Sequence, residues 1–300
     1  MSNIGLKHIQ HIEDLMLSKE ADDKLIAITV LSTIIQSLKE RKHLGVTLMT
    51  KYDGGFSLVF GHHPVKDRLF VASKSAFNKT PKMATDFHEI ERMYFTNPGL
   101  QQKLMTAYAA VQGLNLKPGL FYQGDYLFDA STLTTNKRYV EFTPNVITYR
   151  AARNTSMAQQ VALSYYGLYV HTRYTIEGPS SWRVDYTPDL RHDFAPDPRF
   201  FLKTQGWSWD HEWNLAPITA AWKHAKTNHS WLYAWAYNLK HAIIEVLNQR
   251  AEFETLINGV PSGPEGYVAV FNNVPYKLVN KNEFTAMNNL KWGRQTNINA

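Results

Sequence analysis

The chain reads VTLMTKYDGGFSLVF over residues 46–60, and this stretch predicts the sheet around which the fold is organised. Residues 46–50 and 56–60 are rich in β-branched and apolar side chains, and the Gly-Gly pair between them marks a turn. A third run of this kind, residues 69–72, follows a polar break. Three short strands joined by turns predict an antiparallel meander.

Helical and strand-like patterns alternate through the rest of the chain. Apolar residues recur at the spacing of one helix face in several stretches. We therefore expect helices over 6–42, 85–112, 216–227 and 230–257, strands over 119–128, 138–150, 166–176, 266–271 and 275–279, and loops over 178–217. This order predicts an α+β fold of mainly antiparallel sheets with helical insertions.

The composition restricts the class of protein. The 300 residues are 44% hydrophobic, which is enough for a sizeable core, and no apolar run reaches the roughly 20 residues that a membrane span needs. The first residues lack the basic-then-apolar plan of a signal peptide, so we expect a cytoplasmic protein that does not enter membranes. The absence of cysteine excludes disulfides, thiolate metal sites and a cysteine nucleophile. The net charge of +6 favours a polyanionic partner, although a merely soluble basic protein would carry it too.

Lys51 stands where the first predicted strand meets the turn. An amine there is held by the sheet backbone, and it can act as a nucleophile when it is unprotonated. Gly54, three residues on, lets a phosphate or sugar approach the main chain. The alternative is a surface turn with a solvated lysine.

A second pattern lies near the end of the chain, where residues 265–268 read EGYV and Lys277 follows on the next predicted strand. A carboxylate at the start of a strand, here Glu265, can hold a divalent cation, and a lysine on the next strand can meet a phosphate. The alternative is a hairpin with an exposed glutamate.

Taken together and in this order, these motifs resemble those of the covalent nucleotidyltransferase superfamily, which contains ATP-dependent DNA ligases, RNA ligases and mRNA capping enzymes. The resemblance covers residues 46–281: residues 51–54 are similar to the nucleophile motif, residues 265–268 to the metal-binding motif, and residues 277–279 to the final lysine motif. Three further segments resemble motifs of the family, namely Ser73-Lys74, residues 122–127 and residues 167–171. The sequences of residues 70–82 and 144–149 also resemble those of an uncharacterised ligase-like group from tailed bacteriophages.

The sequence departs from the family's pattern at four positions. Phe56 stands where the family often has arginine, Asp125 where it has glutamate, and Val279 where it has the second lysine of its last motif. Met49 occupies the position of the glutamate that reads adenine in many DNA ligases, so nucleotide specificity is not visible in the sequence.

The resemblance implies a ligase adenylation domain over residues 46–300, with an insertion at 178–258, an N-terminal helical segment at 1–45 and no C-terminal OB domain. It implies a covalent lysyl-AMP at Lys51, with ATP and Mg²⁺ as cofactors. The implied nucleotide-binding residues are Thr50, Asp53, Gly54, Lys74, Asp125, Tyr169, His171 and Lys277, and the implied metal ligands are Glu265 and Asp125.

The resemblance implies that the partner is a nucleic acid, RNA or DNA, whose ends the protein joins. We expect the protein to act as a monomer in the cytoplasm, or in the host cytoplasm if the chain is of phage origin. The short stretch after Lys277 favours an RNA-ligase-like enzyme over a minimal DNA ligase that seals nicks. Basic and aromatic residues interleave over 182–213, which suits either nucleic-acid binding or packing. A non-catalytic nucleic-acid-binding or phage structural protein on a ligase-like fold is the alternative from another class.

Overall fold

A computed structural model describes residues 9–188, 190, 193, 199–203, 207–225 and 232–280. These residues form two compact units. Unit 1 holds the described parts of Gly54–Asn145 and Arg150–Gln205, and unit 2 holds those of His8–Asp53, Val146–Tyr149 and Gly206–Ala300. Both units combine helices with mainly antiparallel strands, so the predicted α+β class is confirmed. Within the described residues, no helix is long and apolar enough to cross a membrane.

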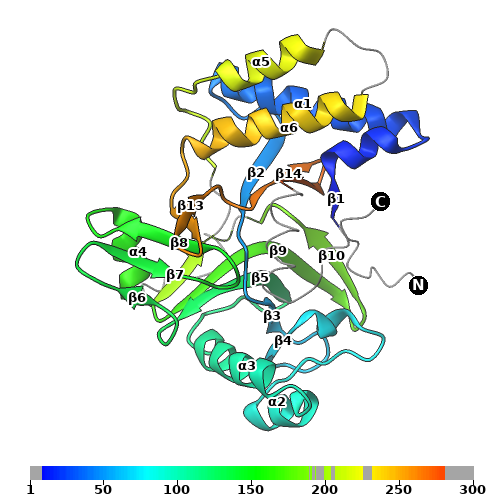
Figure 1. Cartoon of the computed structure of the whole chain (residues 1–300). Coiled ribbons are helices and arrows are strands. Elements are labelled where there is room, and N and C mark those ends of the chain that lie inside the picture. Colours follow the sequence, from blue (N-terminus) through cyan, green and yellow to red (C-terminus); the bar gives the residue numbers. More distant parts are fainter. Residues whose placement is uncertain are drawn as a thin grey trace, which may run out of the picture. The chain divides into compact units, whose positions relative to one another are not determined.

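Unit 2 is built on a four-stranded sheet with the strand order β1-β15-β14-β2 (Figure 1). β14 pairs antiparallel with both β2 and β15, and β1 joins β15 in parallel. The strands are β1 (Gln10–His11), β2 (Val46–Lys51), β14 (Gly266–Phe271) and β15 (Val274–Val279). The unit also contains η1 (Ile12–Leu17), α1 (Ala21–Glu40), α5 (Ala216–Ala225), α6 (Leu232–Asn248) and the hairpin of β12 (Glu254–Ile257) and β13 (Val260–Ser262).

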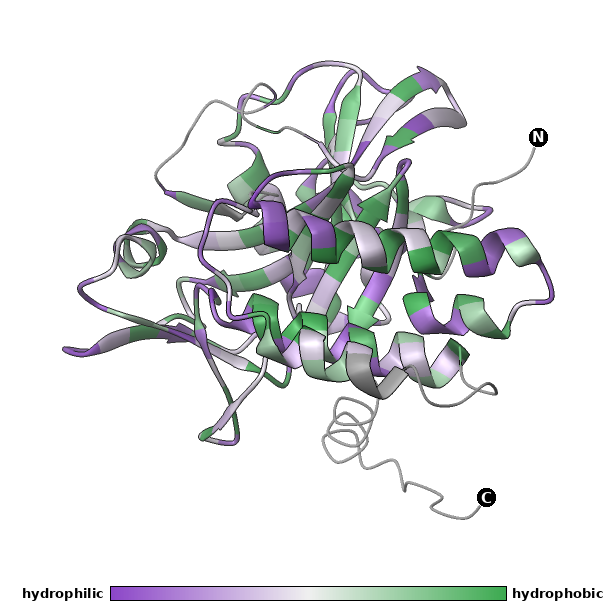
Figure 2. Cartoon of the chain, turned by 90° about the horizontal axis from the view of Figure 1, so that it is seen from above, coloured by the Kyte–Doolittle hydropathy of each residue, from purple (hydrophilic) through white to green (hydrophobic). Residues whose placement is uncertain are grey.

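Alternation along the strands gives this sheet two different faces. Leu48, Tyr267 and Leu278 lie on one face and are buried in a cluster with apolar residues of α1 and α6, such as Leu31 and Ile243. Figure 2 shows hydrophobic and hydrophilic residues alternating along the helices of this unit. Strand side chains have a period of two, so the opposite face carries Lys51, Met49, Val268 and Lys277.

Unit 1 is built on a sheet with the strand order β10-β9-β5-β3-β4, in which β11 also pairs with β9. The strands are β3 (Ser57–His62), β4 (Leu69–Ala72), β5 (Leu120–Asp129), β9 (Tyr166–Gly178), β10 (Ser181–Asp185) and β11 (Phe200–Lys203). The helices are η2 (Lys74–Phe77), α2 (Phe87–Tyr94), α3 (Pro98–Val111) and α4 (Ser156–Leu163), and β6 (Thr134–Thr135) pairs with β7 (Tyr139–Phe142). β8 (Thr148–Ala152) has residues in both units.

The main sheet of unit 1 also has two distinct faces. One face, which includes Phe60 and Tyr122, packs on Ile90 of α2 and Leu104 of α3. The opposite face carries a cluster of buried side chains that we call the aromatic cluster. It consists of Val59, Phe70, Ala72, Ala76, Met83, Phe121 and Tyr174, with Phe77, Ile176, Trp182 and Val184 packed against it.

The predicted meander over residues 46–72 is wrong at its first strand. β3 pairs with β4 as expected, but β2 pairs with β14, which is distant in the sequence. The Gly54-Gly55 turn does not return the chain beside β2, because the Gly55 N–H donates to the Tyr126 carbonyl at 3.0 Å and Tyr126 N–H donates to the Phe56 carbonyl at 2.9 Å. These bonds direct the chain toward β5.

Other helices and strands begin or end at residues different from those predicted, for reasons that are local in the sequence. The strand expected over 138–150 divides into β7 and β8 around Pro144, which has no N–H to give to a ladder. The helix expected over 230–257 ends at Asn248, and 254–257 is β12, whose hairpin turns on Asn258 and Gly259 with φ of 51° and 80°. β1 and η1 precede α1 inside the stretch expected to be helical, and β10 and β11 lie in the stretch expected to be loop.

Gly266 occupies a position that only glycine fits well. Its φ is +142°, and a Cβ there would lie 2.3 Å from the carbonyl oxygen of Leu278. We predict that Gly266→Ala lowers the free energy of unfolding by about 2–4 kcal/mol, because it adds backbone strain and a clash. Urea unfolding followed by circular dichroism measures this. Gly263→Ala is the control, because its Cβ would meet only the flexible Asn248 side chain at 3.6 Å; equal losses in the two variants would contradict the prediction.

Candidate active site

Lys51 and Glu265 form an ion pair at one edge of the unit 2 sheet. Lys51 is the last residue of β2, and Glu265 comes directly before β14. The register sets Lys51 opposite Gly266, so the two side chains leave adjacent points of neighbouring strands. The Lys51 ammonium contacts the Glu265 carboxylate, and the two side chains are 25% and 14% exposed. The first and second sequence motifs are thus adjacent in space.

Lys277 lies on the same face of the sheet as Lys51. Val268 of β14 is the register partner of both Met49 and Lys277, and directly paired residues share a face. Strand spacing and rise put the Lys51 and Lys277 backbones about 10 Å apart across the sheet and about 7 Å apart along it. At this separation, both lysine side chains could contact the same bound triphosphate.

Asp53 is buried and bonds to the backbone of its own unit. Its carboxylate accepts the N–H groups of Val146 and Ile147 at 2.6 and 3.0 Å, and its own N–H donates to the Tyr149 hydroxyl at 2.6 Å. These bonds fix the main chain two residues after Lys51. Asp53 therefore positions the turn.

Tyr52 supports the same turn from inside the core. It is 2% exposed, and its ring centroid lies 5.2 Å from that of Tyr149 and 6.3 Å from that of Phe253. Sequence reasoning gave no role to Tyr149, although it ends the 144–149 segment, and it missed Phe253, because both lie about 100 or more residues from Lys51. Thr50 is the register partner of Tyr267, so it lies on the face opposite Lys51.

In unit 1, the remaining sequence-predicted residues gather at one end of the main sheet. Ser57, Asp125 and Tyr169 are register neighbours on β3, β5 and β9. Gly54 lies against Asp125, since a Cβ on Gly54 would be 2.5 Å from the Asp125 Cβ. This close approach explains why the motif has glycine at that position.

His171 reaches the same end of the sheet through a β-bulge. Gln123 pairs with Thr172 while Gly124 pairs with Val170, so His171 is the extra residue of β9. Bulges re-aim side chains. The His171 Nε2 lies 3.9 Å from a carboxylate oxygen of Asp125, and the two side chains are 23% and 30% exposed.

Tyr169 and Lys74 differ in how accessible they are. Tyr169 is buried, at 4% exposure. Lys74 is exposed and begins η2 directly after β4 and Ser73. Ala72, the last residue of β4, is the partner of Val59, and Ser57, two residues away on β3, is the partner of Asp125. Lys74 thus follows β4 at the sheet end where Asp125 lies.

No group of three or more His, Asp or Glu side chains gathers to hold a metal ion within the described ranges of the chain. This excludes a preassembled carboxylate cage from that part. Mg²⁺ is commonly held by one or two carboxylates together with substrate phosphates. Glu265, next to a lysine and partly buried, fits that kind of site. Asp125, the other expected ligand, belongs to unit 1.

The aromatic residues of the 182–213 segment are largely packing residues. Phe200 and Trp209 are each 6% exposed, and the Trp207 ring lies 5.3 Å from Tyr267 in the core of unit 2. The expectation that these rings bind nucleic acid is therefore not supported for them. Arg191 and the side chain of Lys203 lie outside the described residues.

We predict that Asp53→Ala lowers the free energy of unfolding by about 2–4 kcal/mol, because the buried N–H of Ile147 and the partly buried N–H of Val146 lose their acceptor. Thermal and urea unfolding measure the loss. Asp67→Ala, at an exposed loop position of the same residue type, should change stability by less than about 0.5 kcal/mol. A small loss in Asp53→Ala would show that these bonds do not hold the turn.

Comparison with known proteins identifies a family without a known activity. The sequence model of a family of unknown function, DUF6267, matches residues 3–228 and 211–291, and the chain belongs to that family. No curated protein and no solved structure matches the chain.

Proposed function

We propose that this member of DUF6267 is an ATP-dependent nucleotidyltransferase that forms a covalent lysyl-AMP at Lys51 and transfers AMP to a polynucleotide end. One observation carries the proposal: the Lys51 motif lies on the strand next to the Glu265 motif, which is distant in the sequence. Lys51 is paired to Glu265, and Lys277, on the second strand of the Glu265 hairpin, lies on the same sheet face. A chance resemblance of short motifs would not require this convergence.

The first step balances as a nucleophilic substitution at phosphorus. The neutral amine of Lys51 attacks the α-phosphorus of ATP, a nitrogen–phosphorus bond forms, and the bond to the β-phosphate oxygen breaks. Pyrophosphate leaves, and the amine loses a proton to solvent. Lys277 offsets charge on the phosphates, because a cation aimed at the developing charge stabilises the transition state.

In the proposed site, Lys51 forms an ion pair with Glu265 before the nucleotide binds. The carboxylate holds the lysine side chain in place and keeps its ammonium form paired. Mg²⁺, when bound with the nucleotide, would supply positive charge that offsets the phosphate oxygens. Glu265 is the residue that would hold it, and doing so would release the Lys51 amine from its anionic partner.

Unit 1 carries a polar group of its own, Asp125 with His171, whose chemistry suits a nucleoside. Asp125 and His171 are partly exposed and polar, as binding to ribose hydroxyls and to a base requires. Tyr169 is buried, so His171 is the residue we assign to the base. Lys74, exposed at the same sheet end, is assigned to phosphate.

In the later steps that the resemblance implies, AMP passes to a 5′-phosphate, and a 3′-hydroxyl then attacks that end and expels AMP. RNA ends are our first choice of substrate. DNA nick sealing is the alternative, and parallel assays with 5′-phosphorylated RNA and nicked DNA distinguish the two.

We predict that wild-type protein incubated with ATP and Mg²⁺ gains the mass of one AMP on Lys51. Intact mass spectrometry followed by peptide mapping measures the adduct. Lys51→Arg is the control, because it keeps a cation beside Glu265 but offers no attacking amine at ordinary pH. A wild-type chain that stays unlabelled with all four ribonucleoside triphosphates would end the catalytic proposal.

We further predict that Glu265→Gln and Lys277→Met each slow adduct formation by about 10²–10³-fold, because each removes a charge placed for the transition state. Initial rates of labelling measure the effect. Glu254→Gln and Lys39→Met make the same changes at exposed positions of unit 2 and should label at the wild-type rate. Unfolding midpoints report whether each variant is folded, and near-normal labelling in both site variants would refute these roles.

A further inference from the structure

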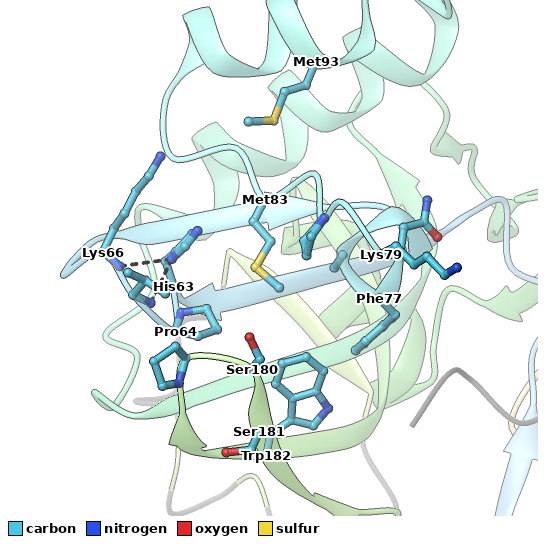
Figure 3. Close-up of a pocket in the computed structure, with 15 residues that line it drawn as sticks. His63, Pro64, Lys66, Phe77, Lys79, Met83, Met93, Ser180, Ser181 and Trp182 are labelled. Carbon is cyan, nitrogen blue, oxygen red and sulfur yellow. Dashed lines mark hydrogen bonds between the residues drawn. The ribbon is translucent and has the colours of Figure 1, made fainter. Parts of the chain in front are cut away.

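Unit 1 contains a pocket of about 810 Å³ that the proposed catalytic chemistry does not use. Its walls come from the loop after β3, from η2 and the loop that follows it, from α2, and from the turn that joins β9 to β10 (Figure 3). Its volume falls within the roughly 300–1,000 Å³ that is usual for ligand pockets.

The pocket has an apolar and aromatic floor. Phe77, Met83 and Trp182 line it, and all three belong to or pack against the aromatic cluster. The Trp182 ring is held edge-to-face, with its centroid 6.1 Å from Phe77 and 5.5 Å from Phe121. A ring fixed in this way offers a preorganised surface against which a planar ligand can stack.

The polar groups of the pocket include cations and neutral side chains but no carboxylate. The Nδ1 of His63 accepts the N–H groups of Val65 and Lys66, both at 3.1 Å, which leaves the ring proton on Nε2 as a donor. Burial and the nearby Lys66 charge lower the pKa of His63, which favours the neutral ring. Lys79 is exposed, and no residue lining the pocket is acidic.

The two lysines of the pocket differ in their pairing. Lys66 bonds to Glu89 at 2.6 Å, and this bond is the main cause that lowers the pKa of Glu89 to about 2. Lys79 pairs with no carboxylate in the part of the chain that the structure describes. Lys79 is therefore the cation of the pocket whose charge is available to an anionic ligand.

The pocket lies on the same sheet face as the Asp125 group. Ser57 and Val59 both lie on this face, because residues two apart in a strand share a face. Ser57 is opposite Asp125, and Val59 belongs to the aromatic cluster. His63 follows at the other end of β3. The six residue-to-residue steps from Ser57 to His63 span about 20 Å, the length of about six stacked nucleotides.

We propose that this pocket binds one nucleobase, with its adjoining phosphate, of a single-stranded polynucleotide. The base stacks on Trp182, with Phe77 against its edge, and the phosphate meets Lys79. The inference deepens the proposed function, because it assigns a place to the polynucleotide at a distance from the residues that react. Every base has a π-face, so stacking of this kind tolerates any sequence, and a cation beside the rings follows the backbone.

The first test is a binding assay without ATP. A fluorescein-labelled 12-nucleotide single-stranded RNA with a 5′-hydroxyl is titrated with the full chain over a range of salt concentrations, and anisotropy is recorded. Lys79→Glu should weaken binding about tenfold at low salt and reduce the salt slope by about 0.7, the value for one phosphate contact on a single strand. Lys79→Arg should keep both.

The control for net charge is Lys137→Glu, which makes the same charge change at an exposed position of unit 1 outside the pocket. It should change affinity by less than about twofold. Equal weakening in Lys79→Glu and Lys137→Glu would mean that only the overall charge matters, and it would overturn the proposal.

The second test measures stacking. Trp182→Phe keeps a ring and should bind within about threefold of wild type, while Trp182→Leu should lose about tenfold or more at every salt concentration. Trp182 also packs in the core, so a cross-linking measurement on wild-type protein supports the variants. RNA that carries 4-thiouridine is irradiated in the complex, and the attached peptide is mapped. Attachment within residues 63–83 or 179–182 supports the pocket, and attachment only elsewhere overturns it.

The same assays with a single-stranded DNA oligonucleotide and with a duplex show which kind of nucleic acid the pocket binds. Tight binding of duplex with no single-strand preference would also contradict the proposal. Failure here is separable from failure of the proposed function, because adduct formation at Lys51 is measured without polynucleotide and binding is measured without ATP.

Discussion

The antiparallel pairing of β2 with β14 is the constraint on which the candidate active site depends. It sets Lys51 opposite Gly266 and so beside Glu265, and it places Lys51 on the same face as Lys277, whose own register is set by the β14–β15 hairpin. A slip of one residue would move every side chain of β2 to the other face and would send Lys51 into the helix-packed core. Gly266 contributes directly, because its positive φ and the nearby Leu278 carbonyl leave no room for a side chain.

The register is specified by what lies on the other face of the sheet. Leu48, Tyr267 and Leu278 are buried in one cluster with α1 and α6, and this burial decides which face of β2 points inward. A fully buried ion pair joins Lys240 of α6 to Glu13 of η1 at 2.6 Å. It connects α6 to the segment that directly follows strand β1 of the sheet. Removing one partner of such a pair leaves an uncompensated buried charge, which typically costs about 3–5 kcal/mol. The lysine that we propose as nucleophile is thus placed by side chains that never touch it.

Unit 1 uses one sheet in two ways. The face that packs on α2 and α3 supplies stability, and the other face carries Asp125 and His171 at one end and the pocket beside Trp182 at the other. The aromatic cluster packs on this face, and Phe77 and Trp182 extend it to the pocket. Ser57 and Tyr174 bind the buried Gln123 between them at 2.9 and 2.8 Å, so the polar end is held by hydrogen bonds to the same cluster.

The α+β class, most strand positions and the chemical character of Lys51, Glu265 and Lys277 could be predicted from the sequence, because alternation, turn residues and residue type are local properties. The Asn258-Gly259 hairpin was also present in the sequence as a local signal, although the helical spacing before it concealed the strand at 254–257. The tertiary structure alone decided that β2 pairs with β14, that Asp53 faces backbone N–H groups, and that a bulge turns His171 toward Asp125. Each of these depends on hydrogen bonds or packing between residues that are far apart in the chain, and no local pattern encodes which distant partner will satisfy them.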